Sequence, residues 1–385
     1  MEEEKIFNVK KGIIAGVILA FIFIIIILFS LYMANKDVRD WIDIYILRKS
    51  VSTQDVSSID LNIEKNNQIY CYGKNICILN DRSLNIYNNY GQKTDTLSID
   101  VNTALFDSSN KYLAIAEKSG KKFDLILDKT LLWEREVEGE ILQVHVNNNG
   151  YVAIVWGDTT YKSIISLYSP EGNELFKNYL SSTRVVDVSV SRDNKFLAFA
   201  EMDTSGTLIQ SNIKIISVEK ATKKAEEAII YSKAEEINKM VVKIKYQEKN
   251  KLVCMYDDSL KIISDNNETE ITKISQDITF ASVDLKNSAT YIKEETSGLF
   301  SSSSIVNIVN TGSNQVTTYS FPEVAKEIYT YDDVIAINIG TDIYFINTSG
   351  LLIKKYTSEQ EVTNIILSNG IALIIYKDRV EIVEL

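Results

Sequence analysis

Two different hydrophobic patterns divide the chain. Residues 12–34 form one unbroken apolar run without a charged side chain, and the sequence has no second run like it. A helix of this length reaches roughly 33–35 Å, which is enough to cross a bilayer core of roughly 30 Å. From residue 57 onwards, apolar residues instead occur in short alternating segments, which are typical of strands. The pattern predicts one transmembrane helix in contact with the lipid bilayer, followed by an all-β domain over residues 57–385.

The flanks of the apolar run favour an uncleaved anchor over a secretory signal peptide. A signal peptide has an apolar core of about 7–15 residues and ends in a small-residue cleavage site, whereas this run is longer and no A-x-A pattern follows it. We expect residues 1–11 to form a short tail and residues 35–56 a juxtamembrane stalk, with a helix on the lipid headgroups as the alternative. Trp41 and Tyr45 suit the membrane–water interface.

Charge bears on both orientation and partners. Residues 1–56 hold seven acidic and seven basic side chains, so the whole net charge of −11 belongs to the β domain. Lys and Arg are nearly balanced across the apolar run, so the charge rule for orientation decides little. A short tail before a large domain favours a cytoplasmic N-terminus and an extracytoplasmic domain in the cell membrane. An acidic domain repels nucleic-acid phosphates, so no nucleic-acid partner is expected.

A repeat of about forty residues runs through the β domain. Its clearest copy contains the strands RVVDVSVS, FLAFAE and NIKIISV, with the turn RDNK between the first two. Repeats of 40–45 residues with four strands each are typical of β-propellers. Eight units of about 41 residues fill the domain, and seven blades is the alternative. The units begin near Gln68, Thr103, Ile141, Arg184, Lys239, Ile278, Ala325 and Thr363.

Ring closure is also predicted from the pattern. The last unit ends after three strands, and residues 58–63 (SIDLNI) offer the missing outer strand. Pairing of the two ends of the domain would remove exposed sheet edges. Residues 219–239 are rich in helix formers, which makes a local helix the competing interpretation there, although AIIYS is the outer strand in the repeat.

Two stretches resemble known propeller families. Residues 130–139 (TLLWEREVEG) look like the docking motif of quinoprotein-type propellers, but Trp133 is replaced at later copies, so no quinone site carries over. Residues 196–217 and 252–264 resemble an uncharacterised bacterial family of membrane-anchored, WD40-like or quinoprotein-like propellers catalogued as a domain of unknown function. That resemblance implies a single anchor and no known catalytic residues.

The sequence lacks the linear motifs that mark common active sites. No phosphate-binding glycine loop, C-x-x-C, H-E-x-x-H or G-x-S-x-G occurs. The three cysteines indicate buried thiols rather than a disulfide framework, and the single histidine, His145, lies in an alternating strand that should face the domain axis. Adjacent acids such as Asp257 and Asp258 suit solvated turns. We therefore expect no catalytic residue, metal or cofactor, and a protein that is not an enzyme.

Long connections between second and third strands give the best functional lead. Residues 156–162, 202–211 and 294–304 all connect these strands, so they should emerge on one face of the disc. Long loops in repeat proteins often bind partners, although these could simply extend the β-ribbon. The residues predicted to contact a partner are Trp156, Tyr161, Leu208, Ile209, Leu299 and Phe300.

These observations predict a scaffold or protein-interaction module at the bacterial cell envelope, binding an unknown protein or envelope component. One alternative is a sensor that binds a small solute in the central channel through His145, Gln143 or Asp187. Another is an envelope hydrolase whose active site is assembled from several blades.

Overall fold

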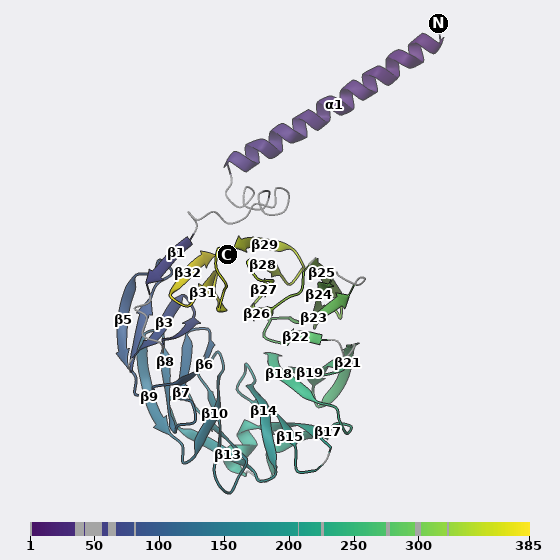
Figure 1. Ribbon diagram of the computed structural model, residues 1–385. Helices are drawn as coiled ribbons and strands as arrows, with labels where there is room; N and C mark the ends of the chain where they lie inside the picture. The colour runs from purple at the N-terminus through teal and green to yellow at the C-terminus, as the bar shows by residue number, and fades with distance from the viewer. Residues whose placement is uncertain are drawn as a thin grey trace.

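The apolar run lies within one long helix. The computed structural model describes residues 2–34, 42, 56–60, 67–80, 82–206, 208–224, 227–274, 278–296, 302–321 and 323–385. Helix α1 spans Glu2–Ala34, so it begins well before the apolar run that starts at residue 12. Residues Gly16–Met33 have a mean hydropathy of 2.9 and do not pack against the rest of the protein (Figure 1). By length and composition, α1 can cross a membrane.

Eight four-stranded antiparallel sheets surround a central axis (Figure 1). This arrangement is an eight-bladed β-propeller, as the repeat predicts. The first four blades along the chain are β2 (Gln68–Tyr72), β3 (Asn75–Asn80), β4 (Ser83–Tyr87), β5 (Lys93–Ser98); β6 (Ala104–Ser109), β7 (Tyr112–Glu117), β8 (Lys122–Leu127), β9 (Thr130–Glu136); β10 (Glu140–Val146), β11 (Val152–Gly157), β12 (Ser163–Tyr168), β13 (Glu174–Leu180); and β14 (Thr183–Val190), β15 (Phe196–Asp203), β16 (Gln210–Ser217), β17 (Ile229–Ala234).

The remaining blades follow the same order, except the closing one. They are β18 (Val241–Glu248), β19 (Lys251–Tyr256), β20 (Ser259–Ser264), β21 (Asn267–Lys273); β22 (Ile278–Ser282), β23 (Ser288–Thr296), β24 (Ser302–Asn310), β25 (Val316–Phe321); β26 (Glu327–Tyr331), β27 (Val334–Asn338), β28 (Asp342–Asn347), β29 (Leu352–Thr357); and β30 (Asn364–Ser368), β31 (Ile371–Ile375), β32 (Arg379–Glu384) with β1 (Val56–Asp60).

The predicted closure of the ring is confirmed. β1 pairs with β32 as the outer strand of the closing blade, with Val56 opposite Val383 and Asp60 opposite Arg379. Residues 61–63, which the sequence assigned to the same strand, lie outside the described residues. The sheet joins residues from both ends of the domain, so the closing blade has no unpaired outer edge at β32.

The core lies between the blades rather than within one. Among the described residues, eight hydrophobic clusters occur, and each joins one blade to its neighbour. The middle strands are therefore covered on both faces, which explains why β12 and β31 are buried along their whole length. Outer strands have one solvated side, and β5 alternates accordingly. The apolar runs of the sequence thus correspond to middle strands.

Tertiary contacts determine the secondary structure of the segment that is rich in helix formers. α3 covers only Val218–Lys223, with Ser217 as its N-cap, and Val218 and Ala221 are buried. The following residues Ile229–Ala234 pair with β16 as the outer strand β17. Pairing with an existing sheet edge outweighs local helix propensity here.

Candidate functional site

A cavity of about 870 Å³ occupies the central channel. Its walls come from the innermost strands of all eight blades, including the predicted channel residues His145 and Asp187. Gln143 instead donates to the carbonyl oxygens of Val185 and Val186 on the next blade, at 3.4 and 3.1 Å. Sequence patterning thus found two residues of the cavity wall from their position on innermost strands.

The cavity opens on the face formed by the turns between first and second strands. Turn residues from six blades contribute to its wall: Asn110, Asn148, Arg192, Lys286, Asp332 and Asn369. The N-terminal end of β1 lies on this same face, because Val56 opposes Val383, Val383 opposes Ala372, and the Leu385 amide donates to Gly370 in the turn beside Asn369. The chain therefore leaves the disc towards α1 on the cavity side.

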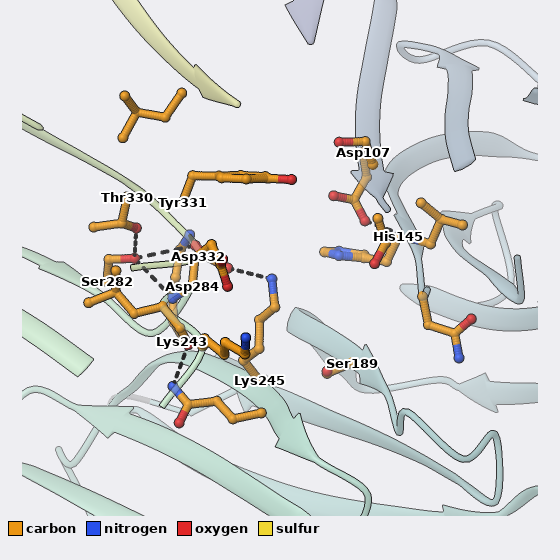
Figure 2. A pocket seen from close by; sticks show the side chains of 18 of the residues that line it. Asp107, His145, Ser189, Lys243, Lys245, Ser282, Asp284, Thr330, Tyr331 and Asp332 are labelled. Carbon is orange, nitrogen blue, oxygen red and sulfur yellow. Dashed lines mark hydrogen bonds and ion pairs between the residues drawn. The ribbon is translucent and has the colours of Figure 1, made fainter. Parts of the chain in front are cut away.

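Positive charge gathers on one wall of the cavity. Lys245 and Lys243 of β18 both face Asp284, with Nζ–Oδ distances of 2.8 and 3.4 Å (Figure 2). Burial raises the pKa of Asp284, but the charges of Lys245 and Lys243 outweigh burial and hold that pKa far below its usual range. Asp284 in turn raises the pKa of Lys245. Two ammonium groups share one carboxylate, so this wall keeps a net positive charge.

Negative charge gathers on the other wall. Asp107 of β6 and Asp187 of β14 flank His145, whose Nε2 lies 3.9 Å from Asp187 Oδ1. Asp187 also borders β18, because its Oδ2 accepts the Ile244 amide between the two lysines. Figure 2 shows Asp107 and His145 across the cavity from Asp284 and its lysines. Burial raises the pKa of both carboxyl groups, and His145 opposes that rise. When both carboxyl groups are ionised, this wall is net negative whatever the charge of His145.

Each of these carboxylates also joins neighbouring blades. Asp107 Oδ2 accepts the Val146 amide at 2.7 Å, and Asp187 Oδ2 accepts the Ile244 amide at 2.9 Å. Innermost strands have one edge without a strand partner, so their amides need another acceptor. The bonds fix the position of both carboxylates in the wall and give each of them a structural role besides any chemistry.

Two of the long connections, on the opposite face, are extended β-ribbons. β15 and β16 stay paired out to Asp203 and Gln210, and β23 and β24 out to Thr296 and Ser302. At the first ribbon, Leu208 and Ile209 are 51% and 37% exposed. The alternative of a ribbon extension is therefore realised, and it presents apolar side chains to solvent.

The other predicted contact residues are placed differently. Trp156 is only 2% exposed and donates its indole N–H to Ser166 Oγ at 2.9 Å, so its ring belongs to the core and offers no outer surface. Tyr161 is half-buried and packs against Tyr179. Leu299, Phe300, Trp41 and Tyr45 lie outside the described residues.

Sequence reasoning missed two further members of the apolar surface. Ile237 and Met240, from the connection between β17 and β18, are 57% and 36% exposed. The Asn238 amide donates to the Ile209 carbonyl oxygen, and Gln210 donates to that of Glu235, both at 2.9 Å, so the two connections are joined. We call Leu208, Ile209, Ile237 and Met240 the ribbon patch. Connections between blades were not considered from sequence, although they reach the same face.

Comparison with protein families identifies the family of the β domain. The family described as "Family of unknown function (DUF5711)" matches residues 47–385. The chain belongs to this family. The resemblance expected from residues 196–217 and 252–264 is thus confirmed for the DUF5711 domain. A search of curated protein sequences gave no match.

Solved structures show the fold of the DUF5711 domain. The C-terminal WD40 domain of Sif2 has a TM-score of 0.57 at 12% identity, with 86% of this chain and 99% of that one covered. BamB from Moraxella catarrhalis has a TM-score of 0.50 at 12% identity, over 88% and 97%. Dihydro-heme d1 dehydrogenase NirN gives 0.52 at 9% identity, over 85% and 75%. At such low identity the likeness concerns the fold alone.

Metal and thiol chemistry receive no support from the described residues. Within them, no group of three or more His, Cys, Asp or Glu side chains is arranged to hold a metal ion. Cys71, Cys77 and Cys254 are buried free thiols. Cys71 and Cys77 belong to hydrophobic clusters on opposite faces of one blade. Burial raises the pKa of all three thiols, which makes them poor nucleophiles.

Proposed function

We propose that the protein is a membrane-anchored, non-enzymatic interaction module whose partner is a protein or envelope component. The observation that carries this proposal is the ribbon patch, four exposed apolar side chains on two joined connections. Exposed apolar side chains that lie together on a rigid support are typical of interaction surfaces. The propeller fold, shared with WD40 domains, is consistent with a role in binding.

The direction of the chain adds a second argument. α1 supplies the anchor in this proposal, and the chain reaches the disc at Val56 on the cavity face. The ribbon patch lies on the other face, where second and third strands are connected. We expect that face to point away from the lipid, with the domain outside the cell, so that a partner could approach it freely.

Site-specific photo-crosslinking in intact cells tests the proposal. A photoreactive amino acid at Leu208 should give a discrete adduct, and the Met240→Asp and Ile237→Asp exchanges should abolish it while thermal unfolding stays unchanged. The control position is Tyr90, which is 71% exposed in the turn between β4 and β5 on the cavity face. The same adducts from both positions, or none from Leu208, would contradict the proposal.

A further inference from the structure

The two walls of the central cavity carry opposite charges that are fixed in place. Lys245 is held by Asp284 at 2.8 Å, and the main-chain N–H of Asp284 donates to Ser282 Oγ at 3.1 Å. Asp107, across the cavity, and Asp187, beside β18, are each held by a main-chain amide of the next blade. The charged groups are therefore pre-positioned on strands, which reduces the entropy lost on binding a ligand.

The charges on the two walls act on one another across the cavity. Lys245 lowers the pKa of Asp107, and Asp107 and Asp187 raise the pKa of Lys245. Asp187 accepts the amide of Ile244, which lies between the two lysines on β18, so one small molecule can reach both signs of charge. A cavity of about 870 Å³ lies within the usual size range for small-ligand sites.

Neither wall is neutralised by its own residues. Lys243 and Lys245 share the single carboxylate of Asp284, which leaves positive charge for an anion. Asp107 and Asp187 have His145 between them, and Lys245 and Lys243 of β18 act on them from further away, while burial makes their ionised forms costly. Tyr331 extends from β26 towards Asp107 in Figure 2 and offers an aromatic face beside the negative wall.

From this geometry we propose that the central cavity binds a small zwitterion, namely an amino acid or short peptide with a free amine and a free carboxylate. The ammonium group lies between Asp107 and Asp187, and the carboxylate contacts Lys243 and Lys245. A simple anion would leave the acidic wall unmatched, and a simple cation would leave the lysines unmatched. This site lies on the opposite face from the ribbon patch, so it does not depend on the proposed docking function.

Calorimetric titration of the full-length protein in detergent tests the site. The probes are the common L-amino acids, L-alanyl-L-alanine and triglycine, each up to about 10 mM, because weak small ligands bind in the millimolar range. At least one probe should bind. Blocking its amine by N-acetylation, or its carboxylate by C-amidation, should each lower the affinity at least about tenfold. A tenfold loss equals about 1.4 kcal/mol, as expected for one lost charged contact.

Two variants test which side chains contact the ligand on each wall. Asp107→Asn keeps the acceptor for the Val146 amide but removes the charge, and Lys245→Met removes the ammonium group that faces Asp284. Each should lower affinity about tenfold or more with unfolding midpoints near that of the parent, whereas Lys223→Met on the remote helix α3 should bind as the parent does. No binding of any probe, or affinity insensitive to either blocked terminus, would overturn the proposal.

Discussion

Val56 lies opposite Val383 in the closing blade, so the first strand of the domain completes a sheet built from the last residues of the chain. Ile59, three pairs further along β1, is 3% exposed. It packs in the cluster between the closing blade and the blade of β2–β5, together with Ile78 and Leu373. Closure of the ring therefore depends on buried apolar contact as well as on backbone pairing.

Truncation of Ile59 should destabilise the whole propeller. Ile59→Ala removes buried methyl groups and leaves a cavity, which costs about 2–5 kcal/mol in the free energy of unfolding. Chemical denaturation of the full-length protein measures this loss. Ser58→Ala on the exposed side of the same strand is the matched control and should change the free energy of unfolding by about 0.5 kcal/mol or less. Equal stability of both variants would show that β1 is dispensable for closure.

A buried ion network joins the blades of β14–β17 and β18–β21. Lys261 Nζ lies 3.1 Å from Glu235 Oε2 and 2.8 Å from Glu268 Oε1, and its side chain is 7% exposed. Lys261→Met should cost about 3 kcal/mol, because the two carboxylates then keep only the partly exposed Lys233 as a counter-charge. Lys223→Met, in an exposed pair with Glu219, should cost less than about 0.5 kcal/mol. Urea unfolding compares the two, and similar losses would refute the argument.

The sequence predicted the repeat, the blade number and the closing strand because these follow from local alternation and turn residues. Turns such as SSNK and RDNK are readable because Asn110 and Asn194 adopt positive φ there. The charged walls were harder to find. Lys243, Lys245 and Asp284 become neighbours only when two blades pack side by side, and the alternating stretch VVKIKY on an innermost strand was their one visible signal.

Trp156 was predicted to be a contact residue, but the structure buries it. Its position near a long connection suggested an exposed contact, yet it lies at the end of β11 opposite Ile164 and packs into the core. The strand continues to Gly157, so the connection is shorter than the sequence indicated. Loop boundaries decide which side chains reach solvent, and a shift of one or two residues moves a side chain from one face to the other.

One inter-blade contact requires glycine for two separate reasons. Gly172 has a φ of +80°, and a Cβ there would lie 2.9 Å from Trp133 Cγ. Trp133 itself donates to the Pro170 carbonyl oxygen at 2.8 Å. Gly370 has a φ of +77° with open space around it. Gly370→Ala should therefore cost about 1–2 kcal/mol from backbone strain alone, and Gly172→Ala about 1–3 kcal/mol more from overpacking.

Denaturant unfolding of the two glycine variants separates the cost of backbone strain from the cost of overpacking against Trp133. Near-ultraviolet circular dichroism provides a second readout, because displacement of the Trp133 ring should alter the aromatic signal in Gly172→Ala but leave it unchanged in Gly370→Ala. Equal losses of stability with identical spectra would show that the added methyl group fits without displacing Trp133.

The pH dependence of stability should reveal one buried carboxyl group. Asp124 on β8 is 2% exposed, and its Oδ2 has no hydrogen-bond partner among the described residues. Burial, with added repulsion from Glu134 and Asp100, raises the pKa of Asp124 to about 7. The native state therefore binds the proton more tightly than the unfolded chain, whose Asp pKa is about 3.9. Stability from this group is greatest below about pH 4 and falls as pH rises to about 7.

Replacing Asp124 with Asn should remove that loss. Asp124→Asn should match the parent near pH 4 and exceed it by about 2–4 kcal/mol above pH 7, as measured by urea unfolding across the pH range. Asp95→Asn is the control with the opposite sign, because hydrogen bonds from Lys129 and Thr94 lower the pKa of Asp95, so its ionised form is favoured and the amide brings no gain above pH 7. A parent and an Asp124→Asn variant whose stability curves run parallel from pH 4 to 8 would mean that this carboxyl group ionises in the folded protein as freely as in the unfolded chain.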